Sequence, residues 1–551
     1  MSKAENRSDA NNVAAAILLS RVFGLLREAF IGATLGLTAA AVAFRLAMRI
    51  PNIIQNLLGE GALGASFVPV YARLLEDEND IEARRVAGGV LGFLLAVIAA
   101  TVAGIVLAAG PLVSVLGAGL DPDTQDLATS LTRITAAGVG LLGVSAWSLA
   151  ILNSHRQYFL GYAAPVAWNV VQIGLLGTVA VFGLAETGPD GATDHQKLAT
   201  WLALAVLVGS ALQLGVMLPR VAALTDHVLP HLGREGETGT VLRRFLPAVG
   251  ARGVVQLSGF IDLFLAGLLA SGAVALLSLV QPLYLLPISV FGFSVATTEL
   301  TEMSRQSAKT SALARRVGIG LRKVTLAAGV CTAIFAFGGD EIAQALYRWP
   351  SQLLGTDLLN SDQNRVIGLT LAAYALALPA SMSARISQNA LFALGDTRTP
   401  ARIALVRLVA MVVASVLFMF QLDRLEMVDG VVRGWGDLPH WAFWEPLPTA
   451  ARHIEGQARL GPIGLGVGAL CASSTEWLLL RRALEQQLRR PVSSGMAFPV
   501  FAASLGAGVC VWLVASFSAL PGPLGAVAVG VVGLAAYIGL LRFQGLKPLT
   551  P

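Results

Sequence analysis

Apolar segments recur along the chain from residue 12 to residue 541 and are separated by short polar stretches. Most reach about 20 residues, the length at which an α-helix crosses the hydrocarbon core of a bilayer. The pattern therefore predicts fourteen membrane-spanning helices. They are expected near residues 12–36, 40–72, 86–111, 127–152, 159–185, 198–219, 243–270, 273–304, 314–338, 364–393, 400–422, 461–480, 496–518 and 523–541. The second segment is too long for one straight span, and Pro51 is expected to bend it.

Composition points to the same class of protein. Of the 551 residues, 55% are hydrophobic and 13% are charged, whereas a soluble domain carries about 25% charged residues. The cysteines all fall inside apolar segments, so neither a disulfide framework nor a metal site is indicated. The expected fold class is an all-α polytopic membrane protein.

Basic side chains are distributed unevenly between the predicted loops. An even number of spans puts both termini on one side of the membrane, where the loops hold 24 Lys and Arg residues, against 7 on the other side. Cytoplasmic loops of membrane proteins carry the excess of basic residues. Both termini are therefore expected in the cytoplasm, and the pI near 9.3 needs no nucleic-acid partner to explain it.

A short internal repeat predicts two halves. "ARRVAGG" at Ala83–Gly89 recurs as "ARRVGIG" at Ala314–Gly320, and each copy opens the third span of its half, as in a parallel repeat. We expect two six-helix halves around a central cavity, followed by two extra C-terminal helices. The expected boundaries are 1–220 for the N-terminal half, 221–242 for a cytoplasmic linker, 243–485 for the C-terminal half and 486–551 for the last two helices and a short tail. Within the C-terminal half, residues 424–459 form an outside insertion rich in Trp and Pro.

Polar side chains line one face of the second predicted span. At about 100° per residue, they cover an arc of about 80° on an otherwise apolar helix. They are Arg45, Arg49, Asn52, Asn56 and Glu60. Charged residues at membrane depth usually face a bundle interior or a wet cavity, so this stripe is expected to line one.

Arginine predominates among the charges predicted to lie within the membrane. The arginines not explained by a nearby helix end are Arg21, Arg27, Arg45, Arg49, Arg252 and Arg385. Acids at this depth are fewer, and a guanidinium matches phosphate or carboxylate oxygens, so the hypothesis is an anionic cargo. The alternative is that each arginine pairs structurally or snorkels to the membrane surface, as expected for Arg133 and Arg407.

The sequence contains no motif that indicates catalysis. A P-loop, a metalloprotease histidine pair and a nucleophile elbow are all missing. Glycine-rich runs such as "GLGVGAL" lie inside predicted spans, where small residues let helices approach closely. Transport without a cofactor is therefore expected, driven by an ion gradient, the membrane potential or substrate flux.

Four longer stretches carry a family resemblance. "SRVFGLLREAFIGATLG" and "RIPNIIQNLLGEGALGASFVPVY" resemble the opening of the MurJ/MviN lipid II flippase family. "ILNSHRQYFLGYAAPVAWNV" is similar to the junction of the family's fourth and fifth spans. "LALPASMSARISQNALFALGDTRTPARIALV" is similar to the junction of its tenth and eleventh spans.

The resemblance implies an alternating-access transporter of the multidrug/oligosaccharidyl-lipid/polysaccharide exporter superfamily. Its cargo would be lipid II, an undecaprenyl-diphosphate-linked peptidoglycan precursor, flipped to the outer leaflet of the bacterial inner membrane. Membrane lipids and cell-wall synthesis proteins are the other expected partners. Arg21 and Arg27 match the family's essential first-helix arginines, Arg49 a basic position and Glu60 an acid. The full predicted binding set is Arg21, Arg27, Arg45, Arg49, Asn52, Asn56, Glu60, Arg252, Gln256 and Arg385.

Several positions depart from the family pattern. Charged residues of the family are replaced here by Val42, Gln55, Pro282 and Leu285. Two alternatives therefore stay open beside lipid II: export of another lipid-linked glycan or a small molecule, and a non-transporting scaffold for envelope assembly.

Overall fold

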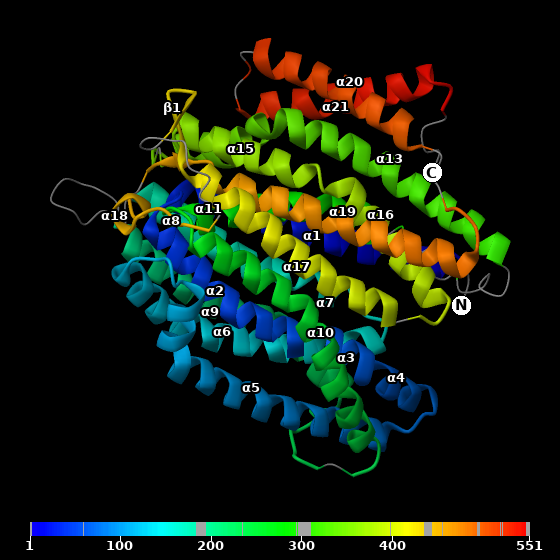
Figure 1. The fold of residues 1–551 in the computed structure, drawn as a ribbon. Coiled ribbons are helices and arrows are strands. Elements are labelled where there is room, and N and C mark those ends of the chain that lie inside the picture. Colours follow the sequence, from blue (N-terminus) through cyan, green and yellow to red (C-terminus); the bar gives the residue numbers. More distant parts are fainter. Residues whose placement is uncertain are drawn as a thin grey trace. The chain divides into compact units, whose positions relative to one another are not determined.

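A computed structural model describes residues 3–58, 60–182, 194–233, 235–293, 295, 303, 310–356, 358–396, 398–434, 444–454, 456–492, 496–517, 520 and 522–546. Contacts between residues divide the chain into two compact units, Met1–Gly267 (unit 1) and Leu268–Pro551 (unit 2). Nearly all of the described residues are helical (Figure 1). The expectation of an all-α membrane fold is confirmed.

The elements described in unit 1 are all helices. They are α1 (Lys3–Leu35), α2 (Ala39–Leu58), α3 (Glu60–Ser66), α4 (Val68–Glu76), α5 (Asp80–Leu116), α6 (Pro122–Ser154), α7 (Tyr158–Ala163), α8 (Pro165–Phe182), α9 (His195–Leu224) and α10 (Glu237–Gly267). Helix α6 packs against α2, α5 and α9, and α8 packs against α1 and α9. These contacts place α8 beside α1, the helix that carries the predicted first-span arginines.

Unit 2 combines helices with a small sheet. Its helices are α11 (Ala273–Pro287), α13 (Thr310–Ala343), α14 (Trp349–Leu353), α15 (Ser361–Ala375), α16 (Leu378–Ala393), α17 (Arg398–Asp423), α18 (Thr449–Arg452), α19 (Gly461–Leu488), α20 (Ala497–Phe517) and α21 (Gly522–Phe543), with π-helical turns η1 (Ile288–Phe293) and η2 (Gln344–Arg348). The strands β1 (Leu425–Val428), β2 (Val431–Gly434) and β3 (Ala458–Arg459) pair antiparallel in the order β2-β1-β3. This sheet belongs to the insertion 424–459, and α20 and α21 lie beside α13 (Figure 1).

Eleven helical segments of the described residues are long and apolar enough to cross a membrane. They coincide with eleven of the fourteen predicted spans. The other three predicted spans, 12–36, 40–72 and 243–270, coincide with α1, with α2 to α4 and with α10. These helices carry the arginines at positions 21, 27, 45, 49 and 252, which lower their apolar character. The count of fourteen stays a prediction.

The second predicted span is divided among three helices. Helix α2 continues past Pro51 to Leu58, and the shorter helices α3 and α4 follow on either side of Phe67. The expectation that residues 40–72 cannot form one straight helix agrees with this division.

The boundary between the units falls one helix later than the boundary predicted from the repeat. Unit 1 includes α10, which packs against α3 and α5. The repeat motifs themselves lie at corresponding places, since Ala83 is near the start of α5 and Ala314 near the start of α13. The division into six-helix halves stays a prediction.

Glycines bring α17 and α19 into close contact. A Cβ added to Gly464 would lie 2.4 Å from the Met419 Cα, and one added to Gly468 would lie 2.0 Å from the Ser415 Oγ. A larger side chain at either glycine would force the two helices apart. The interpretation of "GLGVGAL" as a packing sequence is confirmed.

The "GDTRTP" stretch is the turn between α16 and α17. Gly395 adopts a left-handed conformation with φ of 81°, which a glycine takes without steric cost. The Asp396 carboxylate accepts hydrogen bonds from the backbone N–H groups of Arg398 (3.1 Å) and Thr399 (2.9 Å) at the start of α17. This distinctive motif therefore has a local structural role as a helix stop followed by a cap.

Candidate functional site

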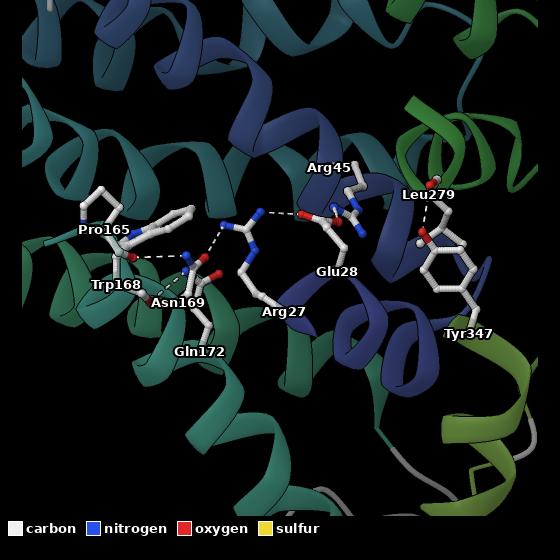
Figure 2. Close-up of polar contacts among 9 residues, drawn as sticks. All are labelled: Arg27, Glu28, Arg45, Pro165, Trp168, Asn169, Gln172, Leu279 and Tyr347. Atoms are coloured by element: carbon white, nitrogen blue, oxygen red, sulfur yellow. Dashed lines mark hydrogen bonds and ion pairs between the residues drawn. The ribbon is translucent and has the colours of Figure 1, made fainter. Parts of the chain in front are cut away.

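A buried carboxylate in unit 1 joins two of the predicted arginines. Glu28 of α1 is 6% exposed, and its two oxygens accept hydrogen bonds from Arg27 of the same helix and Arg45 of α2 (Figure 2). Two guanidinium groups thus share one carboxylate, and the three side chains together carry one net positive charge. An ion cluster of this kind at low dielectric is strongly coupled, because each charge is shielded little by water.

Helix α8 contacts the same cluster from the other side. The Asn169 Oδ1 accepts a hydrogen bond of 3.1 Å from Arg27 Nη1, and the Arg27 guanidinium carbon lies 4.5 Å from the centroid of the Trp168 ring. Figure 2 shows Arg27 between Asn169 and Glu28. Arg27 therefore has a carboxylate on one side, an amide on the other and an aromatic ring nearby, which is a cation–π arrangement.

Local backbone bonds hold the α8 side chains. The Asn169 Nδ2 donates to the Pro165 carbonyl at 3.1 Å, and the Gln172 Nε2 donates to the Trp168 carbonyl at 3.2 Å (Figure 2). Asn169 is 4% exposed and Gln172 is 1% exposed. The sequence analysis did not name these side chains as candidates, although Asn169 and Gln172 are amides inside an apolar span and Trp168 and Asn169 lie in the "AWNV" of a family-like stretch.

The other predicted unit 1 residues with described side chains are Arg21 and Arg49. Arg21 is exposed on α1. Arg49 is partly buried on α2, and its Nε is buried without a hydrogen-bond partner among the described residues. Burial disfavours the Arg49 charge, and the negative charge of Asp262 on α10 favours it. Arg45 and Arg49 thus interact with acids on different helices.

Five predicted site residues have side chains outside the part of the chain that the structure describes. They are Asn52 and Asn56 on α2, Glu60 at the start of α3, and Arg252 and Gln256 on α10. Only their positions on these helices are known. The polar stripe is therefore described at Arg45 and Arg49 alone, and the rest of it stays a prediction.

Arg385 lies in unit 2, on α16. Its Nη1 donates to the Gln388 Oε1 at 3.3 Å. The Arg385 guanidinium also interacts electrostatically with Glu476 of α19, which attracts it, and with Arg407 of α17, which repels it. Arg407 itself forms an ion pair with Glu476, with Nε and Oε2 3.3 Å apart. The Arg407 side chain is 35% exposed and pairs with a glutamate on the neighbouring helix, and the expectation that it snorkels stays a prediction.

Hydroxyl groups form a second polar path in unit 2. Tyr284 of α11 and Ser381 of α16 are hydrogen-bonded at 3.1 Å, and Ser381 donates to Ser473 of α19 at 2.8 Å. Elsewhere in this unit the Tyr347 hydroxyl donates to the Leu279 carbonyl at 2.8 Å (Figure 2). These bonds satisfy hydroxyls that would otherwise be costly in an apolar interior.

The positions that depart from the family pattern are apolar wherever their side chains are described. Val42 is buried in α2, Pro282 is partly buried in α11, and Leu285 is exposed on α11. The side chain of Gln55 lies outside the described residues. Arg45, one turn after Val42, supplies a charge that reaches Glu28.

Comparison with known proteins identifies the family. The family model described as "Lipid II flippase MurJ" matches residues 31–428, which is most of the chain. The chain belongs to the lipid II flippase MurJ family. The matched residues include Arg45, Trp168, Asn169 and Arg385.

Individual members of the MurJ family are similar over much of their length. A probable lipid II flippase MurJ of Rhizobium tropici is 29% identical over 443 residues, which are 77% of this chain and 78% of that protein. The lipid II flippase MurJ of Burkholderia cenocepacia is 28% identical over 416 residues, 73% of this chain and 76% of that protein. A probable lipid II flippase MurJ of Aquifex aeolicus is 31% identical over 293 residues, 52% and 54% of the two chains.

Solved structures share the fold. A lipid II flippase MurJ in an inward closed conformation matches with a TM-score of 0.71 at 18% identity, covering 97% of this chain and 99% of that one. An inward-facing multidrug resistance transporter of the MATE family matches with a TM-score of 0.63 at 13% identity, covering 87% and 98%. Together with its apolar helices, MurJ family membership makes the chain an integral protein of the inner membrane.

Proposed function

We propose that the chain flips lipid II from the cytoplasmic to the outer leaflet of the inner membrane by alternating access. Membership in the MurJ family supports the cargo, and the fold shared with MurJ and MATE transporters supports the transport cycle. Both termini lie in the cytoplasm in this proposal, as the excess of basic residues in the loops on their side requires.

The Arg27–Glu28–Arg45 cluster is the observation that carries the proposal. A diphosphate carries more negative charge than a single carboxylate. This cluster holds two guanidinium groups that share only one carboxylate, so it can attract the further negative charge of a diphosphate. Guanidinium groups pair with phosphate oxygens through parallel N–H donors. The cluster is therefore suited to the diphosphate of a polyprenyl-linked sugar, and the prenyl chain would stay in lipid.

A second cargo, another polyprenyl-diphosphate-linked glycan, is favoured by one observation. Val42 is buried and Leu285 is exposed where the resembled family has charged side chains. The sugar and peptide part of the cargo would meet different groups here, whereas the diphosphate would meet the same arginines. The coupling ion and the absence of a cofactor remain expectations.

The test is rescue of bacteria depleted of their own flippase, with outer-leaflet lipid II as the readout. Arg27→Ala and Arg45→Ala are each expected to lower flipping at least tenfold, because removing one charge-assisted contact to a phosphate costs about 1.5 kcal/mol or more. Arg133→Ala, which removes an exposed arginine of α6, is the matched control and should rescue fully. Normal flipping by both cluster variants would contradict the proposed function, and failure to flip lipid II with binding of another diphosphate glycan would favour the second cargo.

A further inference from the structure

The amide of Asn169 has its orientation fixed by two different partners. Its nitrogen donates to the Pro165 carbonyl of the preceding turn, so its oxygen is left to face Arg27. An amide held in this way offers an acceptor at one place only, because a flipped amide would set a donor against a guanidinium, which has no acceptor. Asn169 is almost completely buried and cannot exchange this partner for water.

Trp168 restrains the same guanidinium through its ring. The Arg27 guanidinium carbon lies 4.5 Å from the ring centroid, within the range of a cation–π contact. Arg27 Nη1 is bound by Asn169, and Arg27 Nη2 is bound by Glu28. These three contacts leave the guanidinium little freedom to rotate about its side-chain torsions.

Glu28 transmits this restraint to a second helix. One of its oxygens is bound to Arg27, and the other is bound to Arg45 of α2. A displacement of the Arg27 guanidinium therefore changes the position of the carboxylate that Arg45 shares. The contacts form one continuous series of hydrogen bonds and ion pairs from α8 through α1 to α2 (Figure 2).

We propose that Trp168 and Asn169 are positioning residues that fix the Arg27 guanidinium and, through Glu28, set the place of Arg45. This inference rests on the proposed function, in which Arg27 and Arg45 meet the anionic head of the cargo. The two α8 side chains act through Arg27 and leave the charge of the site unchanged. Positioning of this kind lowers the cost of organising the cation when the cargo arrives.

The first experiment separates positioning from a general structural role. The purified full chain would be reconstituted in vesicles, and flipping of added lipid II would be measured for Asn169→Leu, Trp168→Leu and Trp168→Phe. Asn169→Leu and Trp168→Leu are each expected to slow flipping about tenfold, the scale of one lost contact to a charged group. Trp168→Phe keeps an aromatic face and should restore most of the rate.

Gln172→Leu provides the matched control on the same helix. Gln172 is as buried as Asn169, and its amide donates to a carbonyl of its own helix. The Gln172→Leu variant should flip lipid II at close to the parent rate. An equal loss in Gln172→Leu would overturn the proposal, since it would show that any lost amide on α8 has the same effect.

A double-variant comparison tests whether the effect passes through Arg27. In an Arg27→Ala background, Asn169→Leu and Trp168→Leu should produce no further slowing, because the side chain they position is gone. Multiplicative losses in the double variants would overturn the proposal.

A chemical readout distinguishes failure of positioning from failure of the proposed function. Phenylglyoxal modifies accessible arginines, and mass spectrometry of the detergent-purified chain reports the rate at Arg27 without any cargo. Asn169→Leu and Trp168→Leu should raise this rate several-fold, and Gln172→Leu should not. Unchanged labelling in both would overturn the positioning role, whereas raised labelling with normal flipping by Arg27→Ala would retain that role and reject the proposed function.

Discussion

At the scale of single residues, the position of Glu28 accounts for how two arginines coexist in an apolar interior. A lone guanidinium at membrane depth costs several kcal/mol, and two adjacent ones repel each other as well. Glu28 forms an ion pair with both Arg27 and Arg45, and Asn169 satisfies a further donor of Arg27. The cluster is tolerated because its members compensate one another.

Removal of the Glu28 charge should therefore destabilise unit 1. We expect Glu28→Gln to lower the free energy of unfolding by about 3 kcal/mol, because it leaves two guanidinium groups without their shared counter-ion. Unfolding of the detergent-purified chain in increasing dodecyl sulfate measures this change.

A second substitution makes the cause of that loss visible. Adding Arg45→Gln to Glu28→Gln removes one of the two unpaired cations, so the double variant should be more stable than Glu28→Gln alone. If the double variant is less stable, mutual compensation of these charges is not the reason for the loss.

The sequence predicted part of this site at the residue scale. Arg27 and Arg45 were identified because guanidinium groups are conspicuous in apolar segments. Asn169 and Trp168 were not, since a tryptophan in a span is ordinary and nothing in the sequence says that α8 packs against α1. The ion pair of Arg407 was not predicted for the same reason: its partner Glu476 is 69 positions away in the sequence and adjacent only in the fold.

At the scale of elements, the junction of α6 and α7 contains a half-buried imidazole. His155 follows the last residue of α6, and its Nε2 lies 3.2 Å from the hydroxyl of Tyr71 on α4. Burial lowers the pKa of His155 below its ordinary value of 6.5, the charge of Arg220 lowers it further, and the charge of Asp80 acts in the opposite direction. The neutral imidazole is therefore the form that this junction accommodates.

The stability of unit 1 should fall in mild acid because of this histidine. The unfolded chain binds a proton at His155 near the ordinary pKa, whereas the folded chain binds it only at lower pH, so stability is lost as the pH falls below about 6.5. Melting temperatures of the parent and of His155→Gln, measured between about pH 7.5 and about pH 5.5, check this expectation.

The comparison depends on the slope and not on the absolute stability. His155→Gln is expected to begin less stable at neutral pH, since it loses the contact with Tyr71. Its melting temperature should nevertheless fall less on acidification than that of the parent. Equal slopes would show that protonation of other groups governs the acid response.

Elements were predicted more completely than their ends. Long apolar runs predicted the positions of α5, α6, α9 and the long helices of unit 2, because length and hydropathy alone determine which segments can span a membrane. The division of residues 40–72 into α2, α3 and α4 was only partly predicted. Pro51 was expected to bend this segment, and helix α2 continues past it to Leu58.

At the scale of the whole molecule, the distribution of basic residues predicts the orientation in the membrane. Loops on the side of the termini hold 24 Lys and Arg residues and loops on the other side hold 7. The segment after α9 should then face the cytoplasm, and the insertion that contains β1 to β3 should face outward. Leu229 in the first segment is 79% exposed and Trp444 in the second is 75% exposed, so each offers an accessible position for a label.

Cysteine labelling in intact cells tests this orientation. The native cysteines Cys331, Cys471 and Cys510 lie within helices of unit 2 and would be replaced by alanine first. With a membrane-impermeant maleimide, Trp444→Cys should be labelled in intact cells, whereas Leu229→Cys should be labelled only after lysis. The opposite pattern would invert the topology, and cargo would then enter the transporter from the wrong leaflet for a flippase that exports lipid II. Labelling of both positions in intact cells would place them on the same side of the membrane. An even number of spans would then lie between them instead of the predicted five, in conflict with the predicted set of fourteen spans.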